Sequence, residues 1–150
     1  IGWLGAHFLL LRGIERGLEW TGLALLSTWA CDSGAYLFGS TMGHHGFFTK
    51  FSPHKTWEGA VGGWSTGLLA TLLLGHLIEL PFVHSLTLGI AIVLAATFGD
   101  LAESMLKRQV GVKDSGKIIP GHGGMLDRVD SLLFVVVVVY YYATRVLGMV

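Results

Sequence analysis

The chain has 150 residues, of which 52% are hydrophobic and only 13% are charged, and its ten basic and ten acidic residues cancel. Its mean hydropathy is +0.62. Soluble domains carry about twice this charged fraction, so the composition argues against a soluble globular domain and also against a disordered chain. The balanced charge leaves no nucleic-acid footprint, and the single cysteine, Cys31, excludes a disulfide framework and a cysteine-based metal site. What remains is the composition of a multi-pass membrane protein.

A helix that crosses the apolar core of a bilayer, about 30 Å thick, needs roughly 20 mostly apolar residues. Four segments are read as such spans, namely residues 20–39, 57–80, 84–99 and 129–150. The last contains a run of valines that could be a buried strand, but beside three other apolar segments it predicts a lipid-facing helix. The sequence therefore predicts an all-α, polytopic membrane protein with about four full transmembrane helices.

The beginning of the chain predicts a truncated helix. The sequence starts at Ile1, within an apolar run, and residues 1–11 are too few to span a bilayer. We therefore interpret residues 1–150 as the C-terminal catalytic part of a longer protein whose N-terminal transmembrane helices are missing here.

Two long polar loops are expected on one side of the membrane, residues 40–56 and 104–126, because two helices separate them. The short uncharged segment 80–83 should make a tight turn, so that the second and third spans form a helical hairpin. Basic residues gather on or beside the long loops: Lys50, Lys55, Lys107, Arg108, Lys113, Lys117 and Arg128. The excess of lysine and arginine over the opposite side predicts that both loops are cytoplasmic.

The densest group of polar residues extends from residue 99 to residue 130. Asp100, Glu103, Ser104 and Lys107 have the spacing i, i+3, i+4, i+7, which places them on one face of a helix. Charged side chains near a bilayer are costly unless they have partners, so we do not expect these residues to face lipid without a function. A simpler alternative for part of it is an ion pair of Asp100 or Glu103 with Lys107.

Two acids of this region, Asp100 and Asp127, should lie at the cytoplasmic ends of different helices. Carboxylates brought together repel one another unless a cation joins them, and Mg²⁺ takes a few carboxylate oxygens and completes its shell with water and phosphates. Lysine and arginine hold phosphate oxygens, and Gly123-Gly124 would let backbone N–H groups approach phosphate. The pattern predicts Mg²⁺-nucleotide chemistry at a membrane surface, although His122 could be only a turn residue and the bases only topology signals.

Three further features lie before this region. Asp32 is an acid within the first full span, and this position makes it a candidate site residue. The alternative is that Asp32 is buried and accepts hydrogen bonds from neighbouring hydroxyl groups. Thr56 is expected to cap the next helix, Glu58 suits its first turn, and Lys55 just before it could meet phosphate. His44-His45 is expected to be a solvated part of the loop rather than a metal site.

Several segments resemble the family of phosphatidate cytidylyltransferases (CDP-diacylglycerol synthases). The resemblance is carried by Ser104-Met105-Leu106-Lys107-Arg108, by Lys113-Asp114 and by His122-Gly123-Gly124-Met125-Leu126-Asp127-Arg128-Val129-Asp130. Residues 32–36 and 52–59 also match family segments in the right order. One departure is His54, where the family usually has a second lysine beside Lys55.

The resemblance implies that CTP and phosphatidate react to give CDP-diacylglycerol and pyrophosphate, with the lipid phosphate attacking the α-phosphorus of CTP. It implies Mg²⁺, with or without a second, monovalent ion, on Asp100 and Asp127, with Asp130 and Glu103 as weaker candidates. Phosphate contacts would come from Ser104, Lys107, Arg108 and Lys113, and nucleotide contacts from Lys55, His122, Gly123, Gly124 and Arg128.

The implied location is the bacterial inner membrane. The implied partners are CTP, phosphatidate and the bilayer, with a homodimer as an option and no nucleic acid. The main alternative is a CTP-dependent cytidylyltransferase for another lipid phosphate. A secondary transporter would need charges near the midplane and internal symmetry, an intramembrane aspartyl protease would need fewer bases, and a lipid-binding scaffold would not need the two acids.

Overall fold

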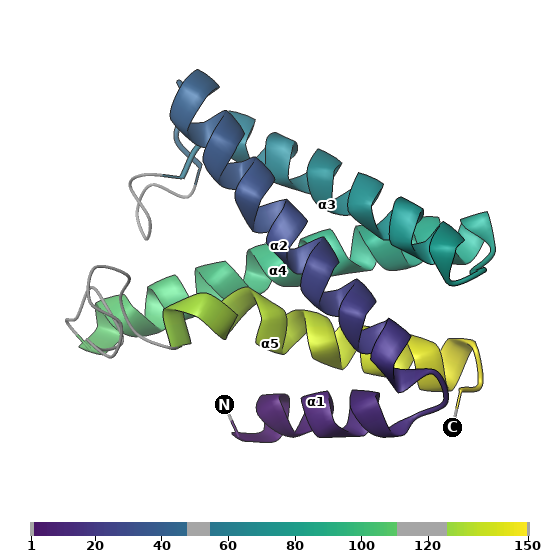
Figure 1. The fold of residues 1–150 in the computed structure, drawn as a ribbon. Coiled ribbons are helices and arrows are strands. Elements are labelled where there is room, and N and C mark those ends of the chain that lie inside the picture. Colours follow the sequence, from purple (N-terminus) through teal and green to yellow (C-terminus); the bar gives the residue numbers. More distant parts are fainter. Residues whose placement is uncertain (1, 48–54, 111–125, 150) are drawn as a thin grey trace.

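The structure is a computed structural model that describes residues 2–47, 55–110 and 126–149, without the side chains of residues 108, 110 and 126–129. All the regular elements in these ranges are helices, as predicted: α1 (Gly2–Gly13), α2 (Gly17–Met42), α3 (Trp57–Leu77), α4 (Phe82–Val110), α5 (Leu126–Tyr141) and the π-helical turn η1 (Tyr142–Val146) (Figure 1). Helix α1 covers the apolar residues near the start of the sequence, and the predicted hairpin is formed by α3 and α4.

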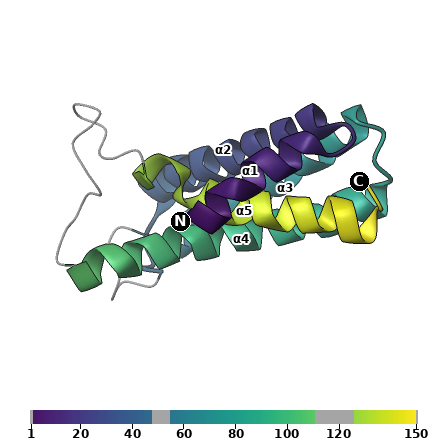
Figure 2. The same cartoon turned by 90° about the horizontal axis from the view of Figure 1, so that it is seen from below.

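The helices form a bundle in which sequence neighbours mostly pack together. Helix α2 packs along α3, α4 lies between α3 and α5, and α1 packs against α5 and α2. Figures 1 and 2 both show α1 beside α5, while α2 crosses the α4–α5 pair obliquely. Toward the ends where α2 and α4 finish and α3 and α5 begin, the α2–α3 pair diverges from the α4–α5 pair (Figure 1).

Glycines allow the close contact of α2 with α3. Gly59, Gly63 and Gly67 are spaced by four residues, so they lie on one face of α3. A Cβ atom on Gly63 would lie 2.8 Å from the carbonyl oxygen of Cys31, and one on Gly67 would lie 2.9 Å from the Cβ atom of Cys31. Small residues at such spacing are how helices approach closely in membranes, and here they bring α2, which carries Asp32, against α3.

We expect Gly67→Leu to destabilise the bundle strongly. The new side chain would meet Cys31 on α2 and Val93 on α4, each of which has an atom 2.9 Å from the position that the added Cβ atom would take. Overpacking of this kind typically costs about 1–3 kcal/mol of folding free energy. Gly22→Leu on α2 is the matched control, because nothing lies within 4 Å of its Cβ position. Thermal unfolding in detergent should show a clear loss for Gly67→Leu alone; equal melting temperatures would contradict the packing.

The valine run of the last span is helical, as predicted, but it does not face lipid on all sides. Val135, Val136 and Val139 are completely buried. They belong to the core cluster, together with Leu88 and Ile92 of α4. The prediction of a lipid-facing helix was therefore wrong for this face, because the i, i+1, i+4 valines pack inward rather than toward lipid.

Two predicted boundaries also differ from the structure. Helix α4 continues to Val110, so residues 104–110 are helical rather than the start of a loop. The sequence contains neither glycine nor proline between residues 100 and 110, and the Lys107–Glu103 ion pair supports the added turns at 3.6 Å. The last span was expected to run to Val150, but its α-helix ends at Tyr141 and a π-turn follows.

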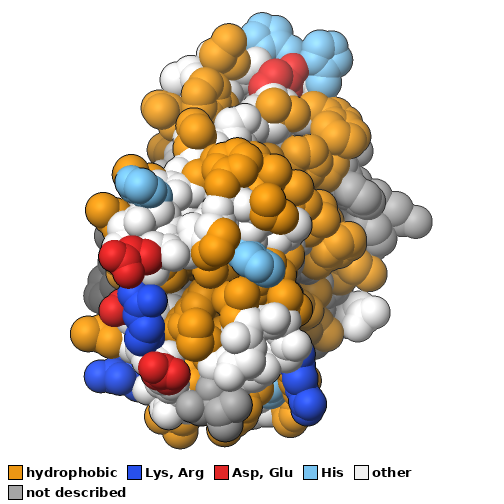
Figure 3. Space-filling view, turned by 90° about the vertical axis from the view of Figure 1, so that its right-hand side faces the viewer, with side chains coloured by type: hydrophobic (Ala, Val, Ile, Leu, Met, Phe, Trp, Pro, Cys, Tyr) orange, Lys and Arg blue, Asp and Glu red, His pale blue; other side chains and the backbone are white. Residues whose placement is uncertain are grey.

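Within the described residues, two helical segments are long and apolar enough to cross a membrane: Trp57–Leu77, and Phe82–Lys107 of α4. Large apolar side chains are exposed on several helices, among them Leu9, Leu18, Leu69, Phe82 and Phe98. The face drawn in Figure 3 is covered mostly by hydrophobic side chains, with few acidic or basic ones. Exposed apolar surface of this extent indicates a partner other than water.

Candidate functional site

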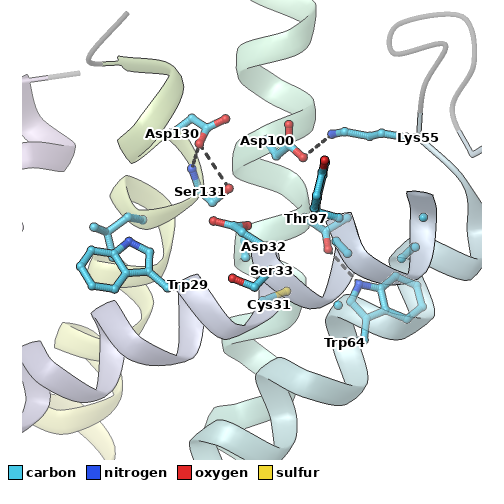
Figure 4. Close-up of a pocket in the computed structure, with 18 of the residues that line it drawn as sticks. Trp29, Cys31, Asp32, Ser33, Lys55, Trp64, Thr97, Asp100, Asp130 and Ser131 are labelled. Atoms are coloured by element: carbon cyan, nitrogen blue, oxygen red, sulfur yellow. Dashed lines mark hydrogen bonds and ion pairs between the residues drawn. The ribbon is translucent and has the colours of Figure 1, made fainter. Parts of the chain in front are cut away.

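A cavity of about 870 Å³ opens among α2, α3, α4 and α5, with Phe8 of α1 at its edge. Its polar lining comes from segments that are far apart in the sequence: Asp32, Ser33, Lys55, Thr56, Thr97, Asp100, Asp130 and Ser131. Figure 4 shows most of these side chains meeting around one space. Polar and charged residues within apolar helices are costly unless they serve a function, so their gathering around one cavity marks it as a candidate site.

Three carboxylates from three helices line this cavity: Asp32 on α2, Asp100 on α4 and Asp130 on α5. Gly99 allows the last two helices to come close. A Cβ atom at Gly99 would lie 2.9 Å from the Cα atom of Ser131 and 3.0 Å from the carbonyl oxygen of Asp130. The lack of a side chain at Gly99 therefore permits the close approach of α4 and α5 next to Asp100.

Lys55 forms an ion pair with Asp100, with 2.5 Å between Nζ and Oδ2. Both side chains are only partly exposed, Lys55 at 23% and Asp100 at 42%. Lys55 is held immediately before α3 because Thr56 caps that helix, its hydroxyl accepting a hydrogen bond of 3.2 Å from the backbone N–H of Gly59. The predicted N-cap is confirmed, and a basic residue at the entrance of α3 reaches across to α4.

The local ion pair that was the simpler alternative forms for Glu103, one of the two acids named for it, and not for Asp100. Lys107 pairs with Glu103 at 3.6 Å, and Glu103 is buried. Asp100 instead pairs with Lys55, from another part of the chain. Neither Glu103 nor Lys107 lines the cavity, and Ser104 does not line it either. Of the predicted stripe on α4, Asp100 is the residue that the structure places in the cavity wall.

The walls around the carboxylates are braced by hydrogen bonds. The backbone N–H of Ser131 donates to Oδ1 of Asp130 at 2.6 Å, and the Ser131 hydroxyl lies 3.3 Å from the same oxygen. On the opposite wall, Nε1 of Trp64 donates to the hydroxyl of Thr97 at 2.9 Å, one turn before Asp100. These bonds restrict the orientation of Asp130 and the separation of α3 and α4 at the site.

The charges in the cavity do not balance. Among the described residues that line it, Lys55 is the only basic one, against three acids. Asp32, Asp100, Asp130 and Lys55 all line it (Figure 4). Carboxylates that share a site repel one another, so an excess of negative charge favours the binding of a cation.

The donor set fits a hard divalent cation that is shared with a phosphate ligand. All three acids offer carboxylate oxygens, which Mg²⁺ prefers, and Mg²⁺ needs only one or two of them when water and phosphate complete its shell. In the described part of the chain, no three His, Cys, Asp or Glu side chains already stand close enough to hold an ion together.

Several predicted site residues fall outside the part of the chain that the structure describes. They are Lys113, His122, Gly123 and Gly124, together with the side chains of Arg108, Asp127 and Arg128. Asp127 belongs to α5, one helical turn before Asp130. The roles expected for these residues stay predictions.

The cavity also has apolar lining residues. Phe8 of α1, Leu25 and Trp29 of α2 and Leu132 of α5 contribute to its lining, beside the carboxylates. A space lined by charged groups and by aromatic and aliphatic side chains suits a ligand that is itself amphipathic.

The sequence predicted Asp32 as a candidate site residue but did not predict which residues would lie near it. Its position within an apolar helix marked it as a candidate, but nothing in the pattern said that it would meet Asp100 and Asp130. The motif that the sequence did carry, glycine at four-residue intervals on the next helix, indicates a close contact of the two helices. It does not say how either helix is rotated.

Known proteins resemble this chain along most of its length. Residues 1–146 match the cytidylyltransferase family. A protein of Staphylococcus aureus (strain COL) named phosphatidate cytidylyltransferase is 44% identical over 138 residues, which is 90% of this chain and 53% of that protein. A protein of the same name from Staphylococcus epidermidis (strain ATCC 35984) is 46% identical over the same share of each chain. The chain thus spans about half the length of these relatives.

Proposed function

The chain belongs to the cytidylyltransferase family, and we propose that the protein transfers a cytidylyl group from CTP to phosphatidate, giving CDP-diacylglycerol and pyrophosphate. One observation carries the proposal. A single cavity combines three carboxylates and a lysine with aromatic and aliphatic lining residues, and this combination suits a nucleoside triphosphate and a lipid phosphate meeting at one place. The names of the staphylococcal relatives support the choice of these two substrates.

The reaction needs no protein nucleophile. A phosphate oxygen of the lipid forms a bond to the α-phosphorus of CTP, the bond from that phosphorus to the bridging oxygen of the β-phosphate breaks, and pyrophosphate leaves with the electron pair. Both substrates are anions, so most of the acceleration must come from positioning and from compensation of charge. The residues of the cavity are suited to these two tasks.

The proposed roles follow the chemistry of the side chains. Asp100, with Asp127 or Asp130, would hold the divalent cation, which when bound would neutralise phosphate charge. Lys55 would donate to phosphate oxygens at the mouth of α3, and the apolar lining residues, Trp29 among them, would receive the lipid. Further phosphate and nucleotide contacts are proposed for Ser104, Lys107, Arg108, Lys113, His122, Gly123, Gly124 and Arg128.

The site is proposed to face the cytoplasm from a bacterial membrane. Helices α2, α3, α4 and α5 would cross the bilayer, and the segments that follow α2 and α4 would carry the lysines and arginines of the cytoplasmic side. The exposed apolar side chains of these helices support this placement. The bacterial origin of the relatives supports the choice of membrane.

The direct test of the proposed function uses the purified full-length protein in detergent with CTP labelled at its α-phosphate. We expect the label to appear in CDP-diacylglycerol only when phosphatidate and Mg²⁺ are both present, together with an equal amount of pyrophosphate. A different lipid phosphate that is used better than phosphatidate would favour the alternative substrate. No transfer of label to any lipid phosphate would refute the proposal.

We expect Lys55→Ala to raise the apparent KM for CTP or phosphatidate. Removing a charge-assisted hydrogen bond typically costs about 1.5–3 kcal/mol, which is roughly tenfold or more in kcat/KM. Within the described residues the Lys55 side chain forms its ion pair with Asp100 alone and is partly exposed, so the melting temperature should change little. Steady-state kinetics with each substrate varied in turn would measure the effect. Parental kinetics would reduce Lys55 to a topology signal.

A further inference from the structure

We propose that Glu58 is a positioning residue for Lys55: it fastens residues 45–47 to the start of α3, and this fastening fixes the Lys55 ammonium group beside Asp100. The inference rests on the proposed function where it concerns the kinetics, but not where it concerns the position of Lys55. Glu58 does not line the cavity, so it would act through Lys55 and not on a substrate.

Glu58 holds His45 by two contacts. One carboxylate oxygen, Oε1, lies 2.6 Å from Nδ1 of His45, and the other, Oε2, accepts a hydrogen bond of 3.2 Å from the backbone N–H of His45. The two residues are 13 positions apart, so the contacts tie two separate parts of the chain. A carboxylate that accepts both bonds defines the orientation of the His45 backbone as well as that of its ring.

The same two segments are joined by backbone pairing around Lys55. The N–H of Phe47 donates to the carbonyl oxygen of Lys55 at 2.7 Å, and the N–H of Trp57 donates to the carbonyl oxygen of His45 at 2.9 Å. Gly46 and Thr56 form the antiparallel bridge between these bonds. The carbonyl group of Lys55 is therefore held by the segment that Glu58 fastens.

Packing completes this short pairing on the side toward the bundle. Phe47 is buried, and its ring centroid lies 4.5 Å from that of Trp57 and 6.4 Å from that of Trp64. Phe47 and Lys55 both line the cavity. In the segment of residues 45–47, Phe47 thus forms part of the cavity wall, while His45 is held by Glu58 at the surface.

This support matters because lysine is a flexible side chain. Its four-carbon stem has many rotamers, and holding its ammonium group at one place costs entropy unless the backbone is already fixed. The Lys55–Asp100 contact of 2.5 Å therefore depends on where the backbone of Lys55 is held. Loosening residues 45–47 should widen the range of positions that the Lys55 ammonium group samples.

Chemical labelling of lysines tests the inference without any reference to catalysis. The full-length protein would be treated with an amine-acetylating reagent for short times, and the rate at Lys55 would be measured by mass spectrometry. We expect Glu58→Ala to raise this rate roughly two- to fivefold, the range that the coupling of an exposed ion pair can account for. Glu15→Ala, which removes an exposed acid elsewhere, is the matched control and should leave the rate unchanged.

A second variant keeps the test decisive if Glu58→Ala folds poorly. His45→Ala removes the ring contact but keeps the backbone N–H that donates to Glu58, so it should raise labelling at Lys55 in the same direction and by less. Unchanged labelling of Lys55 in both variants would overturn the inference.

The kinetics supply the second readout. We expect Glu58→Ala to raise the apparent KM toward that of Lys55→Ala, and to add nothing when it is combined with Lys55→Ala. A full additional effect in the double variant would show that Glu58 acts independently of Lys55 and would overturn the inference. If the parent protein forms no CDP-diacylglycerol, the proposed function fails, and the labelling of Lys55 still decides the role of Glu58.

Discussion

Asp100→Asn should lower kcat/KM for CDP-diacylglycerol formation by about a hundredfold or more, the order found when one electrostatic group is removed from an active site. Asparagine keeps the size of the side chain and one acceptor oxygen, but it has no charge to offer a hard cation. The loss should be accompanied by a weaker dependence on Mg²⁺. Initial rates over a series of Mg²⁺ concentrations, with CTP held well below its KM and phosphatidate saturating, would measure both effects.

The same variant separates a site residue from a structural ion pair. Asp100 contacts Lys55, and if that contact served only stability, its removal would leave Lys55 without its partner and lower the melting temperature. Activity per folded molecule would then survive. We expect the opposite, a melting temperature close to that of the parent and almost no activity. Glu15→Gln is the control for loss of one acidic charge, and it should match the parent in both measurements.

Asp32→Asn should lower kcat/KM by roughly ten- to a hundredfold, although the sequence marked this residue as a candidate without placing it beside Asp100. Its carboxylate shares the cavity with Asp100 and Asp130, and a charge within the same site contributes on the order of 1–2 kcal/mol or more at an effective dielectric of about 20. Removing it reduces the negative charge that favours a bound cation. The loss should therefore be partly restored by raising Mg²⁺, and the loss in Asp100→Asn, which removes a proposed ligand of the cation, should be restored less.

Ser33→Ala is the matched control for Asp32→Asn, because Ser33 is the next residue on α2, lines the same cavity and carries no charge. We expect nearly parental turnover in this variant. Parental turnover in Asp32→Asn as well would remove Asp32 from the site. A loss of activity in Asp32→Asn that follows a fall in melting temperature would instead make Asp32 a structural residue of the α2–α3 contact.

The sequence predicts the helices of this protein well because they depend on local features. Long apolar runs set their existence, Thr56 sets the start of α3, and the absence of breakers after Asp100 allows α4 to continue to Val110. The sequence predicts much less about how the helices are rotated. The run from Val135 to Val139 makes every face of this part of α5 apolar, so the pattern does not show which face is buried. The packing against α4 decides which of these valines are buried.

The sequence likewise predicts some residues of the candidate site but not the contacts between them. The spacing on α4 identified Asp100, and the region after it identified Asp130, because both belong to a continuous polar segment. The Lys55–Asp100 and His45–Glu58 contacts could not be predicted, since each joins residues whose distance depends on the fold. His45 was expected to be a solvated loop residue. Its side chain is indeed exposed, yet it contacts Glu58 because residues 45–47 pair with residues 55–57 at the start of α3.

The acidic cavity is proposed to bind a divalent cation together with the phosphates of CTP, and the binding of Mn²⁺ in place of Mg²⁺ would show this without any catalytic turnover. The free Mn²⁺ signal in electron paramagnetic resonance would be followed as full-length protein is added in the presence of CTP, with the same CTP solution as background. We predict CTP-dependent Mn²⁺ binding by the parent and by Glu15→Gln, weakened about tenfold or more in Asp100→Asn. Equal Mn²⁺ affinity in Asp100→Asn and the parent would contradict a cation site at Asp100.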